Sequence, residues 1–161
     1  MSRSGYTDDC DDILVYGRWR GAVKSALRSR RGQAFLQELI DALDAMPDKR
    51  LGADALRTDD GAYCALGVVG QARGLDLEAI DPEEREEVAQ AFGIDEAMAA
   101  EIMYENDTSI GESRLVTFEI FGPMIRPSIS HSRTVRIPRT DVAERRWLYM
   151  RDWAAKQLRV T

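Results

Sequence analysis

The chain has 161 residues, about one domain's length, and its 44% of apolar residues are enough for a hydrophobic core. Its 28 acidic and 22 basic side chains give a net charge of −6, and its two cysteines and one histidine exclude a disulfide scaffold and a four-ligand zinc site. No apolar run approaches the ~18 residues of a membrane-spanning helix, so we expect a soluble, cytoplasmic protein without a secretory signal peptide.

The first 36 residues change from acidic to basic. Residues 1–12 hold four acids and have little to bury, so we expect a flexible acidic N-terminus. Apolar residues then fall at positions 19, 22, 23, 26 and 27, the spacing of one helical face. Lys24, Arg28 and Arg31 lie on the opposite side. The pattern predicts a basic amphipathic helix.

Gly32 separates this helix from a second apolar series, which runs from Phe35 to Met46 and ends before Pro47. We predict two helices, or one helix kinked at Gly32. The mixed segment 48–61 that follows is predicted to contain a short helix, with Leu51 and Leu56 as its core anchors.

Residues 64–73 predict a helix of small residues that ends at Gly74. Because Gly67 and Gly70 lower helix stability, we expect a neighbouring helix to approach closely there. The alternative is a ligand pressed against the backbone.

Two further helices follow. Asp81 and Pro82 are typical of the N-cap and first position of a helix, which would end at Gly93. Asp95 then caps a helix over 96–106.

The character changes after Thr108. Val116, Phe118 and Ile120 alternate with polar residues, as do Val135 and Ile137, which predicts two strands. We expect a β-hairpin near 114–138 with its connection over 126–134. A last helix is expected from Thr140 or Asp141 to about Leu158.

The predicted fold is mainly α, with five to seven helices around one core and a β-hairpin insertion near 114–138. We expect one helical domain over 13–161, in which the insertion occupies about 108–140. The inward helix positions predict buried side chains at Ala22, Val23, Leu27, Leu39, Leu43, Leu66, Val69, Phe92 and Ile102.

The sequence contains no recognisable catalytic motif. The sequence has no phosphate loop, dinucleotide fingerprint or nucleophile elbow. His131 is predicted in a polar loop and Cys64 in the core, while Cys10 lies among aspartates that blunt thiol reactivity. We expect no enzyme, no cofactor and no metal site.

Two charged segments are candidate binding sites. In the acidic middle of the chain, Glu83, Glu84, Glu86 and Glu87 predict a protein-binding surface; the plainer interpretation is that they keep a helix soluble and favour its N-terminus. In the basic segment, Arg18, Lys24, Arg28 and Arg31 form the candidate nucleic-acid site. The plainer interpretation there is pairing with the acidic middle.

Residues 89–102 also have the spacing of a helix-turn-helix. Its second helix offers glutamates where a DNA reader carries Arg, Lys, Asn or Gln, so it would repel a duplex. We interpret this corner as structural.

Three stretches carry a resemblance: RWRGAVKSALRSRRGQAFLQELIDALDAMPDKRL (18–51), CALGVVGQARGLD (64–76) and the 80–107 block ending VAQAFGIDEAMAAEIMYEND. Together they resemble a group of small proteins encoded by bacteriophages and prophages, a group without an assigned activity. The resemblance covers about 2–107 and the last helix, including Trp153 and Gln157. The chain departs from the group at about 108–140, so we expect that insertion to be specialised.

The resemblance implies phage origin and the cytoplasm of a bacterial host. We expect a non-enzymatic accessory protein that binds a host protein, as an inhibitor of a nucleic-acid-handling defence complex such as a CRISPR effector. The alternative is a nucleic-acid-binding phage regulator that uses the basic helix 18–31. We expect no membrane partner, and self-association into a homo-oligomer is compatible with the sequence.

Overall fold

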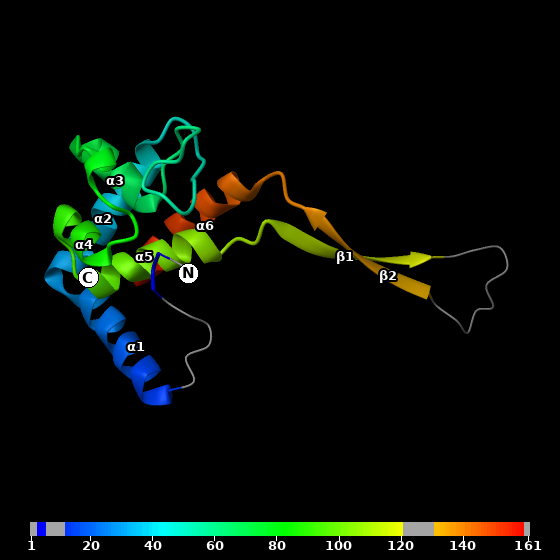
Figure 1. Ribbon diagram of the computed structural model, residues 1–161, viewed down its shortest axis with the longest axis horizontal. Coiled ribbons are helices and arrows are strands. Elements are labelled where there is room, and N and C mark those ends of the chain that lie inside the picture. Colours follow the sequence, from blue (N-terminus) through cyan, green and yellow to red (C-terminus); the bar gives the residue numbers. More distant parts are fainter. Residues whose placement is uncertain (1–2, 6–11, 121–130, 160–161) are drawn as a thin grey trace. The chain divides into compact units, whose positions relative to one another are not determined.

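The computed structural model describes residues 3–5, 12–120 and 131–159 (Figure 1). It is mainly helical with one antiparallel hairpin, which confirms the predicted fold class. The chain divides into two compact units: a helical unit, Met1–Ile110 with Ala143–Thr161, and a hairpin unit, Gly111–Val142.

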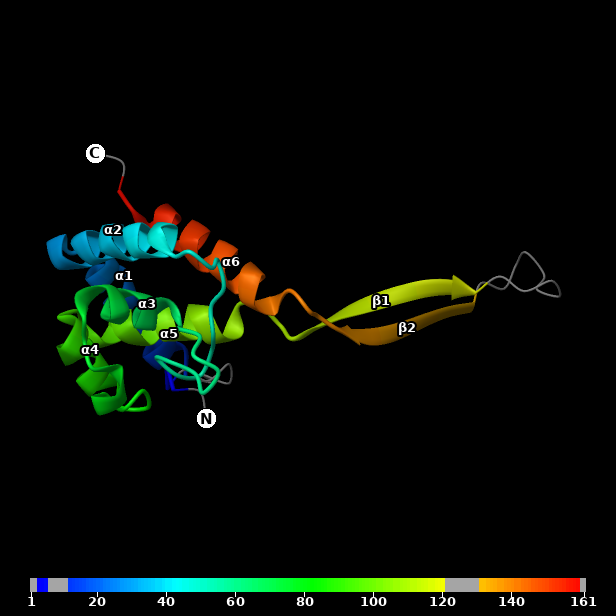
Figure 2. The ribbon, with the colours of Figure 1, turned by 90° about the horizontal axis from the view of Figure 1, so that it is seen from above.

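Six α-helices and one 3-10 helix occur among the described residues. Their bounds are α1 Ile13–Arg28, α2 Arg30–Ala45, α3 Ala65–Arg73, η1 Leu77–Ala79, α4 Arg85–Phe92, α5 Glu96–Thr108 and α6 Val142–Gln157. α5 packs against α1, α3 and α4, and α2 packs against α1 and α3. α6 lies beside α2 (Figure 2), where the Trp147 indole N–H donates to the Leu43 carbonyl at 3.1 Å. No described helix is long and apolar enough to cross a membrane.

The first two helices break at Ser29. The Ser29 hydroxyl donates to the Ala26 carbonyl at 2.7 Å and accepts the Gly32 N–H at 2.9 Å, so one residue ends α1 and begins α2. A Cβ on Gly32 would lie 2.1 Å from the Ala26 oxygen. The close approach therefore requires glycine. Of the two predicted alternatives, two separate helices is right, but the break lies at Ser29 and Gly32 is in the first turn of α2. α1 itself begins earlier than Trp19, since Asp12 caps its first turn.

The glycines of α3 permit close approach, which other helices (η1 and α4) make at Gly70, as predicted, but a loop makes at Gly67. A Cβ on Gly67 would lie 1.9 Å from the Leu56 carbonyl oxygen, which belongs to a loop rather than to a helix. At Gly70 the neighbours are the side chains of Leu77 and Phe92. The C-terminal end is as predicted, with Gly74 in the left-handed region at φ 71°.

The predicted core is buried with one exception. Val23, Leu27, Leu39, Leu43, Leu66, Val69, Phe92 and Ile102 are all buried. Ala22 is exposed, and its prediction was wrong. The reason is that α1 packs through Val23, Ala26 and Leu27, with Trp19 partly buried beside them, and the neighbouring position 22 turns toward solvent.

One predicted helix is absent from the structure, and one predicted helix boundary was wrong. Residues 48–61 form a loop instead of a short helix, with Leu51 and Leu56 still buried and Asp54 at a positive φ of 62°. α4 begins at Arg85 rather than at Pro82. Asp81 accepts the Glu83 N–H at 2.9 Å through its side chain and the Glu84 N–H at 3.2 Å through its carbonyl, which closes a separate turn before the helix.

In the hairpin unit, β1 (Ser113–Ile120) pairs antiparallel with β2 (His131–Pro138), in a register that places Thr117 opposite Thr134. The predicted hairpin is confirmed, but β2 begins at His131, which we expected in a loop. The rest of the expected connection, 126–130, lies outside the described residues. Apolar Val116, Val135 and Ile137 share one face and stay only half-buried, since the hairpin has no second layer among the described residues of its unit.

Candidate functional site: the acidic surface and the Arg3 pocket

The predicted acidic residues form a continuous exposed segment. Residues 76–87 contain seven acids and one base, Arg85. We call these acids the acidic surface: Asp76, Glu78, Asp81, Glu83, Glu84, Glu86 and Glu87, all of which are exposed. The four glutamates predicted as a binding site therefore lie together at the start of α4.

The members of this surface differ in what they do locally. The Asp76 carboxylate accepts the Glu78 N–H at 3.2 Å, and the Glu87 carboxylate accepts the Asp81 N–H at 3.2 Å, so both stabilise turns. The side chains of Glu83, Glu84 and Glu86 form no hydrogen bond or ion pair with any residue that the structure describes. These three carboxylates are available to a partner.

The N-terminal segment lies against the same region. The Arg85 guanidinium donates to the Ser4 carbonyl at 3.3 Å, and Gly5 is so close that a Cβ there would lie 3.0 Å from the same guanidinium. Ser4 and Arg3 are buried. The expectation that this stretch has little to bury is wrong for these residues, while 1–2 and 6–11 lie outside the described residues.

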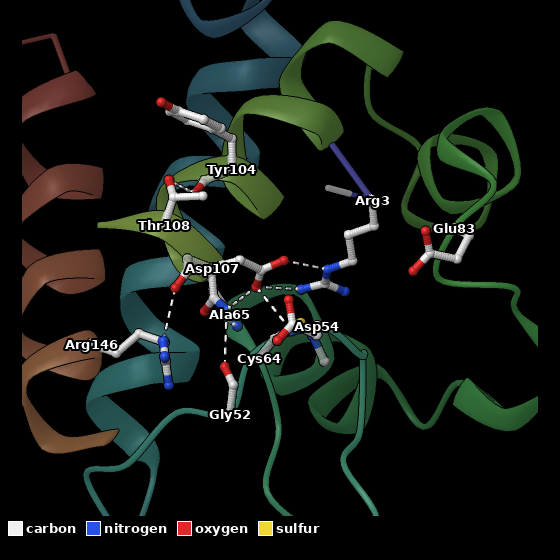
Figure 3. Close-up of polar contacts among 12 residues, drawn as sticks. Arg3, Gly52, Asp54, Cys64, Ala65, Glu83, Tyr104, Asp107, Thr108 and Arg146 are labelled. Carbon is white, nitrogen blue, oxygen red and sulfur yellow. Dashed lines mark hydrogen bonds and ion pairs between the residues drawn. The ribbon is translucent and has the colours of Figure 1, made fainter. Parts of the chain in front are cut away.

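Arg3 forms an ion pair inside the helical unit (Figure 3). Its Nε donates to Asp107 Oδ2 at 2.6 Å and its Nη2 to Oδ1 at 2.9 Å, while the two side chains are 1% and 4% exposed. Its third nitrogen, Nη1, is buried without a hydrogen-bond partner among the described residues. The fold thus holds a buried guanidinium with one nitrogen that no described residue pairs.

Asp107 is held in place by other groups as well. The Asp54 N–H donates to Oδ1 at 3.2 Å, and Asn106 Nδ2 donates to the same oxygen at 2.8 Å. Asp54 adopts its left-handed backbone, which is costly for a residue other than glycine, at this contact. The unfavourable backbone conformation of Asp54 thus lies where its N–H binds the Asp107 carboxylate.

Asn106 and Arg146 extend this network across the helical unit. Asn106 is fully buried; its Oδ1 accepts the Ala65 N–H at 3.0 Å, and its Nδ2 also donates to the Gly52 carbonyl at 2.9 Å. The buried Arg146 of α6 donates to the carbonyls of Asn106 and Leu51 at 2.8 and 2.9 Å. α3, α5, α6 and the 51–54 loop thus meet at one set of satisfied polar groups.

We call the groups around the guanidinium the Arg3 pocket: Asp107, Asn106, Asp54 and Cys64. Burial lowers the pKa of the Arg3 guanidinium, but the adjacent Cys64 sulfur and Asp107 carboxylate outweigh it, so the pKa is raised above its usual value. Arg3 therefore stays charged. In the view of Figure 3, Glu83 of the acidic surface lies on the side of the guanidinium away from Asp107.

The predicted nucleic-acid site is exposed too. Arg18, Lys24, Arg28 and Arg31, together with Arg30, are exposed and form no ion pair with any described residue. Pairing with the acidic middle, the plainer interpretation, holds for Arg20, which contacts the buried Glu101 at 2.9 Å. These five exposed cations form the basic surface of α1 and the first turn of α2.

The helix-turn-helix corner is structural, as we interpreted it. α5 buries Met98, Ala99, Ile102 and Met103 between its neighbours, and Glu101 is buried with them. A helix enclosed in this way cannot enter a DNA groove.

The Arg3 pocket was not predicted from the sequence. The available signal was small: Arg3 is the one basic residue among the four acids of residues 1–12. Its partner Asp107 is 104 positions away in the sequence, so no local pattern joins them.

Comparisons with protein-family models, with curated proteins and with solved structures find no match for this chain.

Proposed function

We propose that this protein is a non-enzymatic binding protein that attaches to a basic partner protein through its acidic surface. The observation that carries the proposal is the set of three exposed carboxylates, Glu83, Glu84 and Glu86, which have no partner among the described residues. Exposed charges of one sign speed the encounter with an oppositely charged surface and select against like-charged partners.

A basic surface on the partner points to a protein that handles nucleic acid. Such proteins present Lys and Arg to phosphates, and carboxylates displayed on a turn and a helix start can occupy the same groups. The resemblance to phage-encoded proteins supplies the setting. We therefore propose a host protein as the partner, and inhibition of a nucleic-acid-handling defence complex, such as a CRISPR effector, as the consequence.

The test compares charge reversal at two places. One variant carries Glu83→Lys, Glu84→Lys and Glu86→Lys, and the matched control carries Asp41→Lys, Asp48→Lys and Asp152→Lys, which are exposed acids outside the acidic surface. Both variants change the net charge equally. Glu87 is left unchanged because its carboxylate supports the Asp81 turn.

Immobilised wild-type protein and both variants are incubated with lysate of a bacterial host, and bound proteins are quantified. We expect the wild type and the control to retain one basic, nucleic-acid-binding protein that the reversal variant loses. The captured protein should also be released by a competing polyanion. Equal capture by all three would contradict the proposal.

A second candidate function, nucleic-acid binding, is favoured by the basic surface, whose five cations form no ion pair with a described residue. A Cβ added to Gly17 or Gly21 on the same helix would meet nothing within 4 Å, so a phosphate backbone can approach α1 closely. Contact with three phosphates of duplex DNA would give a slope of about −3 in the logarithmic salt dependence of binding. Arg18→Gln, Lys24→Gln and Arg28→Gln should together remove that slope, measured by fluorescence anisotropy. Salt-independent binding by the wild type, or binding by the triple variant equal to that of the wild type, would contradict the proposal.

A further inference from the structure

Arg3 is enclosed by residues that belong to other parts of the helical unit. Arg3 belongs to no helix or strand. The groups around its guanidinium belong to the framework: Asp107 is in α5, Cys64 is the N-cap of α3, and Asp54 lies in the 51–54 loop. Removing Arg3 would leave all of these groups in elements that do not depend on it.

The carboxylate of Asp107 is also oriented without Arg3. The Asp54 N–H and Asn106 Nδ2 both donate to Oδ1, and Asn106 is fixed in turn by the Ala65 N–H and the Gly52 carbonyl. A carboxylate fixed in this way accepts a guanidinium through two parallel bonds with little loss of freedom. A lysine ammonium has no planar fork, so it does not match both oxygens with two parallel bonds.

The pocket lies beside the acidic surface. Ser4, next to Arg3, receives a hydrogen bond from Arg85, which stands between Glu84 and Glu86 in the sequence. A partner segment that docks on the acidic surface would therefore lie next to the N-terminal residues Arg3 and Ser4. The unpartnered Nη1 of Arg3 shows that the chain's own arginine does not use all of its donors among the described residues there.

We propose that the Arg3 pocket is a receptor for an arginine side chain of the basic partner, and that Arg3 occupies it in the free protein. This inference rests on the proposed function and adds the chemistry of the contact, which is one buried guanidinium on Asp107. Arg3 is a tethered competitor with an effective concentration in the millimolar range. The partner's arginine must displace it, so the partner binds more weakly than it would to an empty pocket.

The pocket can be tested without the partner, in the full chain carrying Arg3→Ala. The probe is N-propylguanidinium, an arginine side-chain mimic, and n-butylammonium is the lysine mimic. The matched control is Arg151→Ala, which removes a similar two-bond contact with Asp44, but at the exposed surface where water competes. A ligand that binds only the folded state raises the melting temperature (Tm) by an amount that grows with the logarithm of its concentration once that concentration exceeds the dissociation constant.

We expect N-propylguanidinium at millimolar concentrations to raise the Tm of Arg3→Ala by a few degrees, with the logarithmic concentration dependence of a single binding site. The wild type, Arg151→Ala and every sample with n-butylammonium should show no such rise. Arg3→Lys, which keeps the charge, is the second variant and should respond in the same direction as Arg3→Ala, although less.

A receptor must also be stable when empty. If neither Arg3→Ala nor Arg3→Lys folds, Arg3 is a permanent part of the core and the proposal is overturned. Equal responses to the two probes, or no response in either variant, overturn it as well. Because this experiment contains no partner, its failure is distinct from failure of the acidic surface to capture one.

Discussion

The Arg20 guanidinium of α1 donates from one nitrogen to both carboxylate oxygens of Glu101 in α5, at 2.9 Å each. Arg20 is partly exposed, whereas Glu101 is almost fully buried. The contact joins the basic first helix to the central helix of the unit, and it places a carboxylate where water is scarce.

This pair predicts a pH dependence of stability. Burial raises the pKa of the Glu101 carboxyl above its ordinary value of 4.5, and the opposing effect of Arg20 does not cancel it. The folded state thus binds the proton more tightly than the unfolded state, so this group's contribution to stability falls as pH rises from the unfolded pKa through the folded one. The Glu101→Gln variant should not show this decrease in stability with rising pH, because it has no carboxyl group at position 101. Chemical denaturation of both proteins from about pH 4 to about pH 8 measures it, and a difference between them that does not change with pH would refute the assignment.

The core assignment predicts a contrast between two leucines. Leu39 is fully buried, and Leu39→Ala should lower the free energy of unfolding by about 2–5 kcal/mol. Leu148 is 60% exposed, and Leu148→Ala should change it by less than about 0.5 kcal/mol. Urea denaturation gives both values; equal effects would show that the helix faces are misassigned.

Two glycines predict effects of opposite sign. Gly67→Ala places a Cβ 1.9 Å from the Leu56 oxygen and should destabilise the protein by about 1–3 kcal/mol. Gly21→Ala, with open space around it in α1, should stabilise it by about 0.5–1 kcal/mol. The Tm of each variant tests the close approach of the Leu56 carbonyl to α3. An unchanged Tm for Gly67→Ala would contradict that close approach.

The two-unit organisation predicts that the helical unit folds without the hairpin. An isolated two-stranded hairpin is marginal in water, so it should contribute little to the stability of the rest. Replacing residues 111–142 by a Gly/Ser linker should preserve the helical circular-dichroism signal and a cooperative melt. Loss of cooperative unfolding would mean that the core depends on the hairpin.

Sequence reasoning succeeded where a signal was local. Gly74 and Gly93 ended helices, Asp95 capped one, and strand alternation identified the hairpin, because each of these depends on neighbouring residues. It failed where tertiary contacts decide. Ala22 has a helical position that no other described element covers, and the 48–61 loop keeps its leucines buried through contacts rather than through a helix.

The two parts of the candidate site differ in the same respect: the acidic surface has a local sequence signal, and the Arg3 pocket depends on a tertiary contact. Exposure of Glu83, Glu84 and Glu86 followed from the density of acids, since so many like charges cannot be buried together. The Arg3 pocket depends on two residues that are 104 positions apart, and only the fold brings Arg3 to Asp107.

The central claim is that the acidic surface makes the contact with the partner. Its most direct test is the dissociation constant of the captured, purified partner, measured by titration calorimetry at low and physiological salt. Three exposed pairs are together worth about 0.6–3 kcal/mol, so reversal of Glu83, Glu84 and Glu86 to lysine should weaken binding by about 3- to 100-fold and reduce its salt dependence. The Asp41, Asp48 and Asp152 control should bind like the wild type. Unchanged affinity and salt dependence in the Glu83, Glu84 and Glu86 variant would contradict the claim.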